Sequence, residues 1–217
     1  MRVLELFKGT GSISGYFNQT DGAAAADGKT EVISLDILPR FGATICCDIM
    51  LWDYKSYPRG YFDIIWASPE CKVFSALNST NVGPTRKYKT KGDLIQVQKE
   101  NSKYILRTIE IIEYFNPTNY FIENPLHSKI WEYIPDSYKP TENSVVVDYC
   151  YFGYPYKKPT RILTNKVLEN RRCACKRHQY QIGITTRNKL LPGQAPDKTT
   201  TIQRYEVPKD LIEYLLA

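Results

Sequence analysis

One cysteine of this sequence stands where a thiol can react rather than pack. Cys71 follows Ser68, Pro69 and Glu70, directly after the apolar run of residues 62–67. A structural thiol fits better inside such a run, whereas a loop at the end of a strand gives the open setting that a thiolate nucleophile needs. Cys71 is therefore a candidate nucleophile, with an inert, half-buried cysteine as the alternative.

A glutamate occupies a similar place after another short apolar run. Residues 120–122 lead directly into Glu123, Asn124 and Pro125. A carboxyl group in a desolvated cleft can stay protonated near neutral pH, and it can then donate a proton to a ring nitrogen. Glu123 is thus a candidate general acid, and a carboxylate that caps the turn at Asn124 is the alternative.

A glycine loop lies where the periodicity changes from strand-like to helix-like. Gly9 and Gly11 separate the apolar residues 3–7 from residues 13–17. Glycines there let the backbone approach a ligand with its amides exposed, although a tight turn needs them for structural reasons alone. Asp36 ends the next apolar run, where a carboxylate can bind both ribose hydroxyls of a nucleoside or cap the following turn.

The order of these segments predicts an α/β fold built on an open, mainly parallel sheet. The strand-like runs are interrupted by a helical pattern over residues 92–115, which ends before Pro117. In such sheets ligands bind beyond the carboxyl ends of the strands, so the candidate residues should converge on one crevice. The predicted strands cover residues 3–7, 31–35, 45–49, 62–67, 120–122, 144–147 and 161–164.

The composition favours a single soluble, intracellular domain. The chain has 217 residues and no apolar stretch long enough to span a bilayer. Its six cysteines are expected to be reduced thiols, since no secretion signal is recognisable. Cys173, Cys175 and His178 resemble part of a zinc site, but a structural zinc ion usually has four protein ligands. We therefore assign no metal site.

The charge of the chain favours a polyanionic partner. The formal net charge is +6, and the cations gather with tyrosines in a few segments. Such segments can contact phosphates and stack on bases, or they can form an ordinary solvated face. The segments are residues 86–91, 157–161 and 171–177, and the tyrosines are Tyr88, Tyr154, Tyr156 and Tyr180.

Taken in order, these motifs resemble those of the DNA cytosine-5 methyltransferases, and the versions found in phages and other viruses look most similar. The resemblance covers residues 1–165 and continues at Val207-Pro208. It implies a Rossmann-like, class I S-adenosylmethionine-dependent methyltransferase with helices on both faces of the sheet. The motifs are Phe7-Lys-Gly9-Thr-Gly11, Asp36, Asp48, Pro69-Glu70-Cys71, Glu123-Asn124-Pro125, and the stretch from Gly153-Tyr-Pro155 to Arg161.

The resemblance implies covalent chemistry on a cytosine in duplex DNA. Cys71 would add to carbon 6 of the ring, and Glu123 would donate a proton toward nitrogen 3. Arg161 or Lys158 would hold the base, which must flip out because carbon 6 is hidden in a stacked duplex. The implied S-adenosylmethionine site comprises Phe7, Gly9 and Gly11 on the methionine side, Asp36 at the ribose, Asp48 at the adenine, and Ile37, Ile49, Ser68 and Pro69.

Two departures from the family pattern bear on activity. Glu70 stands where the family has a second proline, and a neighbouring carboxylate disfavours a thiolate. The family's Gln-x-Arg-x-Arg is replaced by Tyr156-Lys-Lys158-Pro-Thr-Arg161, so the position of the base-holding cation is open. Two other functions therefore stay open: a nucleic-acid-binding protein of this fold without turnover, and the same chemistry on RNA.

The part of the chain after residue 165 is short for target recognition. We expect residues 1–165 to form the catalytic domain that binds S-adenosylmethionine. Residues 166–203 would form a reduced target-recognition segment. Such a small segment favours a short or relaxed recognition site on the DNA, or recognition with the help of another subunit. Residues 204–217 would contain a helix that begins at Pro208 and packs back on the catalytic domain.

Overall fold

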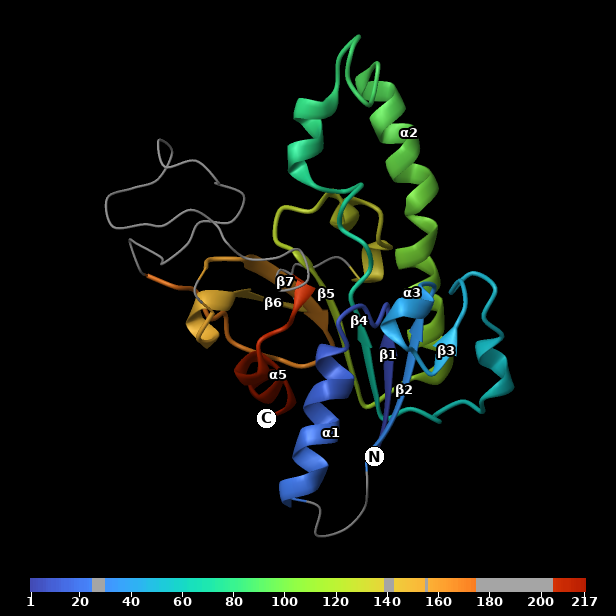
Figure 1. Ribbon diagram of the computed structural model, residues 1–217, viewed down its shortest axis with the longest axis vertical. Coiled ribbons are helices and arrows are strands. Elements are labelled where there is room, and N and C mark those ends of the chain that lie inside the picture. Colours follow the sequence, from blue (N-terminus) through green and yellow to red (C-terminus); the bar gives the residue numbers. More distant parts are fainter. Residues whose placement is uncertain (25–29, 139–142, 155, 175–204) are drawn as a thin grey trace.

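The computed structural model describes residues 1–24, 30–138, 143–154, 156–174 and 205–217 (Figure 1). Its centre is a seven-stranded sheet with the order β3-β2-β1-β4-β5-β7-β6. β7 is antiparallel to both of its neighbours, and the other neighbouring strands are parallel, which confirms the expected mainly parallel sheet. The strands are β1 (Arg2–Leu6), β2 (Glu31–Asp36), β3 (Ile45–Cys46), β4 (Ile64–Ala67), β5 (Asn119–Pro125), β6 (Ser144–Asp148) and β7 (Pro159–Thr164).

Helices cover both faces of this sheet because strand side chains alternate between two apolar cores. On one face α3 (Lys103–Phe115) buries its isoleucines in a core that also contains Leu4 of β1. On the other face α1 (Ser12–Ala24) and α5 (Lys209–Leu216) share a core with Val3 of β1. The arrangement leaves the carboxyl ends of the parallel strands uncovered by these helices (Figure 1).

The helix predicted over residues 92–115 is divided in two at Ser102. α2 (Lys91–Asn101) begins with a capping box, in which the Thr90 hydroxyl accepts a hydrogen bond from a backbone amide of the first turn. At its other end the Ser102 hydroxyl donates to the Lys99 carbonyl at 2.7 Å, a local bond that tends to bend helices. Figure 1 shows α2 extending beyond the sheet from the end of α3.

Other boundaries also differ from the prediction. The third predicted strand is reduced to β3, so Asp48 and Ile49 lie in the turn after it. There the Asp48 carboxylate accepts a hydrogen bond from the Met50 amide at 2.9 Å. β5 and β7 are longer than predicted because they pair with each other from Phe121 to Pro125. Short 3-10 helices fill the connections: η1 (Pro39–Phe41), η2 (Tyr54–Ser56), η3 (Ala76–Asn81), η4 (Lys129–Glu132), η5 (Asp136–Tyr138) and η6 (Tyr149–Phe152).

The C-terminal helix α5 follows Pro208 and closes one core of the molecule. Its side chains Leu211, Ile212 and Leu215 are buried in the core that it shares with α1. Upstream of it, the Val207 amide donates to the Ser12 hydroxyl at 3.0 Å, which ties the end of the chain to the glycine loop. Within the described residues, no helix has the length and apolar character that a membrane span requires.

Candidate active site

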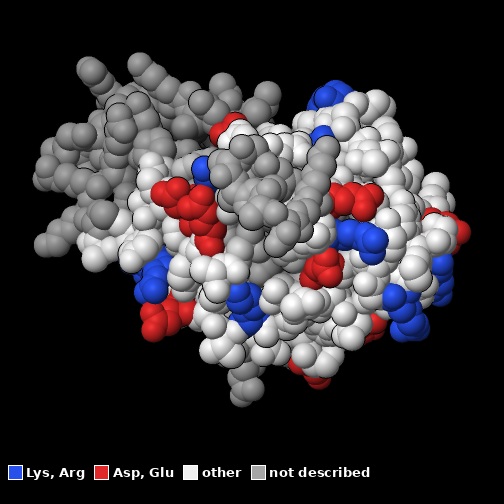
Figure 2. All heavy atoms as spheres, turned by 90° about the horizontal axis from the view of Figure 1, so that it is seen from below, with Lys and Arg blue, Asp and Glu red and all other residues white. Residues whose placement is uncertain are grey.

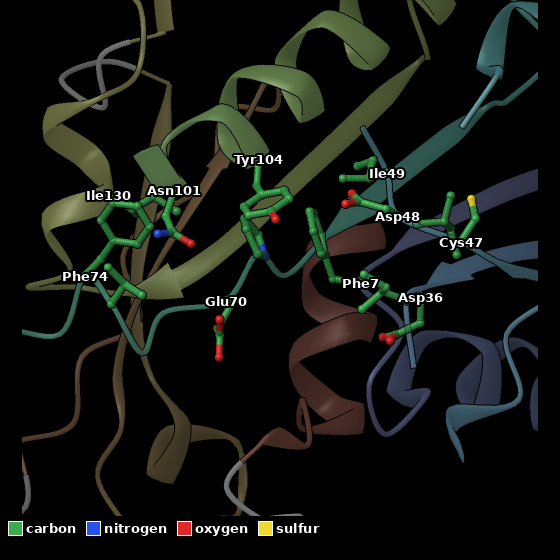
Figure 3. Close-up of a pocket in the computed structure, with 14 residues that line it drawn as sticks. Phe7, Asp36, Cys47, Asp48, Ile49, Glu70, Phe74, Asn101, Tyr104 and Ile130 are labelled. Carbon is green, nitrogen blue, oxygen red and sulfur yellow. The ribbon is translucent and has the colours of Figure 1, made fainter. Parts of the chain in front are cut away.

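The glycine loop turns sharply out of β1. Phe7, Gly9 and Gly11 all have positive φ angles, of 59°, 50° and 73°. The φ of Gly11 favours glycine, and a Cβ atom added there would also crowd side-chain atoms of Lys8 and Ser14 at 3.0 Å. The turn brings the Phe7 ring to a pocket beyond the end of the strand (Figure 3).

Glu5 neutralises the start of α1, which the sequence analysis missed. Its side chain is buried, with 2% exposed. One carboxylate oxygen accepts from the Ile13 amide at 3.1 Å and the other from the Ser14 amide at 3.2 Å. Burial raises the pKa of Glu5, and these hydrogen bonds oppose that effect. The amides that bind phosphate at helix starts in dinucleotide folds are therefore occupied by a carboxylate.

Asp36 ties the end of β2 to the glycine loop. Its Oδ2 atom accepts from the Gly9 amide at 2.9 Å, and its Oδ1 atom accepts from the Leu38 amide at 2.8 Å. The side chain also lines the pocket, where its remaining lone pairs can reach a ligand. Asp36 thus combines the two alternatives that the sequence left open, a turn cap and a candidate ligand group.

The pocket gathers six of the residues predicted for the cofactor site: Phe7, Asp36, Ile37, Asp48, Ile49 and Pro69. Gly9 and Gly11 shape it through the loop without lining it, and the Ser68 hydroxyl instead accepts from Trp66 Nε1 at 3.0 Å. Asn101 and Tyr104, from the junction of α2 and α3, were not predicted (Figure 3). The other lining residues that the sequence analysis missed are Leu35, Cys47, Glu70, Val73, Phe74 and Ile130.

The pocket is acidic although the chain is basic. Asp36, Asp48 and Glu70 line it, and within the described residues no lysine or arginine does. A phosphate group would find no cation there, and the amides at the start of α1 already have Glu5 as their partner. The lining therefore fits a ligand with an aromatic base, ribose hydroxyls and a positive charge. S-adenosylmethionine has these parts and carries no phosphate.

Cys71 is half-buried, directly follows the pocket-lining residues Pro69 and Glu70, and senses the charges of Glu123 and Lys158. Burial is the main cause that raises the pKa of its thiol, and the negative charge of Glu123 raises it further. Lys158 lowers the pKa, whereas Glu70 contributes the smallest increase. Glu123 therefore opposes the thiolate more than Glu70 does, although only Glu70 departs from the family pattern.

Glu123 is held by Tyr149, a residue that the sequence analysis missed. Glu123 is 7% exposed, and its Oε1 atom accepts a hydrogen bond from the fully buried Tyr149 hydroxyl at 3.1 Å. Lys158 Nζ lies 3.5 Å from the same oxygen and 4.4 Å from the centre of the Tyr149 ring. Glu123, Tyr149 and Lys158 therefore form one cluster of side chains.

The loop that carries Cys71 is braced from two directions. Asn124 Nδ2 donates to the Pro69 carbonyl at 2.8 Å, which joins the loop to β5. On the far side of Cys71, Asn78 Nδ2 donates to the Val73 carbonyl at 2.9 Å, and Gln98 Nε2 of α2 donates to it at 3.2 Å. These bonds fix the backbone on both sides of the thiol.

The two candidate cations are placed differently. Lys158 belongs to the cluster around Glu123, whereas Arg161 lies opposite Asn124 on β7 and so points away from the face that holds Glu123. The Arg161 guanidinium lies over the Trp131 ring, 5.9 Å from its centre, and burial lowers its pKa. Lys158 thus lies beside Glu123, and Arg161 lies beside Trp131.

Comparison with known proteins decides the family. No model of a known protein family matches the chain. A protein of Frog virus 3 (isolate Goorha), named a probable DNA (cytosine-5)-methyltransferase, is 32% identical over 169 residues, which cover 76% of this chain and 71% of the relative. The chain belongs to the DNA (cytosine-5)-methyltransferase family.

A solved methyltransferase structure has a similar fold. The Entamoeba histolytica methyltransferase EhMeth matches with a TM-score of 0.50 and 15% identity, over 79% of this chain and 56% of that one. The S. pombe Dnmt2 methyltransferase has a TM-score of 0.48 and 16% identity, over 78% and 53%. This member of the family thus spans little more than half of those structures.

In this cytosine-5 methyltransferase family member, Asp148 fastens the start of the proposed recognition segment. Its Oδ2 atom accepts from Arg172 Nε at 3.0 Å and from the Cys173 amide at 2.9 Å. Burial alone would raise the pKa of Asp148, but these hydrogen bonds and the nearby Lys157 lower it overall. Residues 175–203 of that segment lie outside the described residues.

Two expectations about this part of the methyltransferase are corrected. Cys173 takes part in a disulfide, whereas Cys46, Cys47, Cys71 and Cys150 are free thiols. A disulfide sulfur is no thiolate ligand, and the other two candidate zinc ligands, Cys175 and His178, lie outside the described residues.

The expected stacking of tyrosines on bases is also corrected. Tyr88 and Tyr156 are 4% and 1% exposed, so neither ring is free to stack on bases. Tyr180 also lies outside the described residues.

Proposed function

We propose that this protein methylates carbon 5 of cytosine in DNA through a covalent bond between Cys71 and a flipped-out base. The observation that supports the proposal is that Cys71 directly follows Pro69 and Glu70 of the acidic pocket and that Glu123 and Lys158 act electrostatically on its thiol. A cofactor on one side and a base on the other would then meet at the thiol.

The protein groups perform the ring chemistry. The Cys71 thiolate forms a bond to carbon 6, and electrons move toward nitrogen 3 and carbon 5. Glu123 donates a proton toward nitrogen 3, and Lys158 counters the negative charge that develops on the ring. This makes carbon 5 nucleophilic. After methylation, nitrogen 3 returns its proton to Glu123 and carbon 5 loses its proton to water. The electrons of that carbon–hydrogen bond re-form the double bond between carbons 5 and 6, and Cys71 leaves as the thiolate.

The acidic pocket is proposed to hold S-adenosylmethionine. Asp36 would bind the ribose hydroxyls and Asp48 the adenine, with Phe7, Ile37 and Ile49 in apolar contact. When bound, this cofactor supplies an activated methyl group. The pocket would also keep water from the methyl donor, because its walls are largely apolar.

DNA is proposed to bind at the carboxyl ends of the parallel strands, where the loop with Cys71 follows β4. α2 and the segment before it project beyond this edge (Figure 1), and Arg86, Lys87 and Lys89 are exposed on the projection. The face seen from below in Figure 2 carries acidic and basic side chains interspersed, and so lacks such a one-sided charge. We assign residues 166–203 to reading a short site and residues 204–217 to the catalytic domain.

The proposal is tested by locating a transferred methyl group. The purified protein is incubated with tritiated S-adenosylmethionine and either mixed-sequence duplex DNA or tRNA, and the products are digested to nucleosides. Label on 5-methylcytosine from DNA is expected, and none with the Cys71→Ala variant. Label on tRNA alone would assign the chemistry to RNA. Cofactor binding without transfer to either substrate would instead indicate a binding protein without turnover.

A further inference from the structure

We propose that Glu70 lets the pocket discriminate between S-adenosylmethionine and its demethylated product, S-adenosylhomocysteine. The inference rests on the proposed function, since it concerns the same cofactor site. The two molecules have nearly the same shape. They differ in the transferred methyl group and in one positive charge, because the sulfonium becomes a neutral thioether when the methyl group leaves.

The position of Glu70 follows from the chemistry at Cys71. The methyl group must reach carbon 5, next to the carbon that bonds Cys71, so the sulfonium must lie at the Cys71 end of the pocket. Glu70 directly precedes Cys71 and lines the pocket. In Figure 3 its carboxylate stands apart from those of Asp36 and Asp48, the groups assigned to ribose and adenine.

The charge of Glu70 is available to a ligand. Asp36 already accepts two backbone hydrogen bonds, and Asp48 accepts one. By contrast, no hydrogen bond or ion pair engages the Glu70 carboxylate within the described part of the chain, not even with the nearby Lys72. With no lysine or arginine among the described lining residues, nothing in the wall neutralises it.

A carboxylate in this place attracts a sulfonium and gains nothing from a thioether. The attraction is partly screened because Glu70 is exposed in the absence of a ligand. We therefore expect an effect of about threefold to tenfold on the dissociation constant of S-adenosylmethionine. The consequence is weaker inhibition by product. Glu70 has a matching cost, the small increase in the pKa of Cys71 described above.

Calorimetric titration of both ligands tests the inference, and its readout does not depend on methyl transfer. Wild type and Glu70→Gln are each titrated with S-adenosylmethionine and with S-adenosylhomocysteine. Glutamine keeps the size of the side chain and removes its charge. Binding of S-adenosylmethionine should weaken by about threefold to tenfold in the variant, with binding of S-adenosylhomocysteine unchanged. Asp53→Asn, an exposed carboxylate away from the pocket, serves as the control and should change neither.

Two outcomes would overturn the inference while leaving the proposed function intact. Equal weakening of both ligands would show that Glu70 shapes the pocket instead of reading charge. Unchanged binding of both would show that its carboxylate does not face the sulfonium. If wild type bound neither ligand, the proposed function itself would fail, and the inference with it.

Discussion

The two halves of the site are built from different kinds of contact. In the proposed cofactor pocket the polar side chains mainly bind backbone, as Asp36 does with Gly9 and Leu38. On the proposed base side, Glu123 contacts the side chains of Tyr149 and Lys158, and its charge acts on Cys71. Substitutions in the pocket should therefore change affinity. Substitutions in the base-side cluster, which comprises Glu123, Tyr149 and Lys158, should change the rate of methyl transfer, because these side chains act on one another and on Cys71 through their charges.

The largest effect is expected from Cys71→Ala. Removing the thiol removes the nucleophile, so methyl transfer should fall to background. S-adenosylmethionine affinity should stay near that of wild type, because the proposed partner of Cys71 is the base and Cys71 does not line the pocket. Transfer of tritium and calorimetry measure the two properties. Cys46→Ala, an exposed free thiol, is the matched control. If Cys71→Ala still transferred methyl groups, Cys71 could not be the nucleophile.

Glu123→Gln should slow methyl transfer and speed the alkylation of Cys71. Methyl transfer should fall by about 10²-fold to 10⁴-fold, because a proton donor is lost. Alkylation of Cys71 by iodoacetamide should become faster below the raised pKa of the thiol, since the neighbouring charge that raises this pKa is gone. Mass spectrometry of the Cys71 peptide separates it from the other free cysteines.

Lys158→Met should have the opposite effect on the alkylation of Cys71. Lys158 lowers the pKa of Cys71, so its removal should raise that pKa and slow alkylation at neutral pH. Methyl transfer should slow as well. Faster alkylation in Lys158→Met, or slower alkylation in Glu123→Gln, would show that the charges do not act on Cys71 as proposed.

Tyr149→Phe should have an intermediate effect. The variant keeps the ring and loses the hydroxyl that donates to Glu123, so methyl transfer should fall by about tenfold to a hundredfold. Tyr154→Phe is the control, since its hydroxyl faces Glu206 at 3.5 Å instead. Methyl transfer that is unchanged in Tyr149→Phe would reduce Tyr149 to a packing role.

Asp36→Ala should have the smallest of these effects, and only on the cofactor side. Loss of the carboxylate should weaken S-adenosylmethionine binding by about tenfold, and it also frees the Gly9 amide from its partner. Alkylation of Cys71 should not change. Calorimetry with Asp53→Ala as the control checks the affinity, and an unchanged dissociation constant would remove Asp36 from the ribose contact.

The sequence could predict the residues that follow a strand directly, but not the residues that tertiary contacts bring to them. Asp36, Cys71 and Glu123 each follow an apolar run, and the ends of parallel strands meet at one edge, so the sequence was enough to group them. Tyr149 follows β6 and reaches Glu123 because β7 pairs with β5 on one side and with β6 on the other, and no local sequence pattern indicates this pairing. Glu5 resembled an ordinary strand residue, although its burial beside α1 gives it a capping role.

Residues far from the strand ends were harder to foresee. Tyr104 lines the pocket because α2 and α3 are divided at Ser102, whereas the periodicity predicted one continuous helix. Arg161 and Lys158 were equivalent in sequence, and only the pairing of β7 separates their faces. Positions fixed by local pattern were thus predictable, and positions fixed by tertiary pairing were not.

Covalent trapping tests the central claim most directly. Duplex DNA of mixed sequence with 5-fluorocytosine at every cytosine is incubated with the protein and S-adenosylmethionine, then resolved under denaturing conditions. Fluorine replaces the proton that must leave carbon 5, so the adduct should persist and digestion should show the base attached to Cys71. Methylation of ordinary DNA by this protein without any trapped adduct would contradict the account.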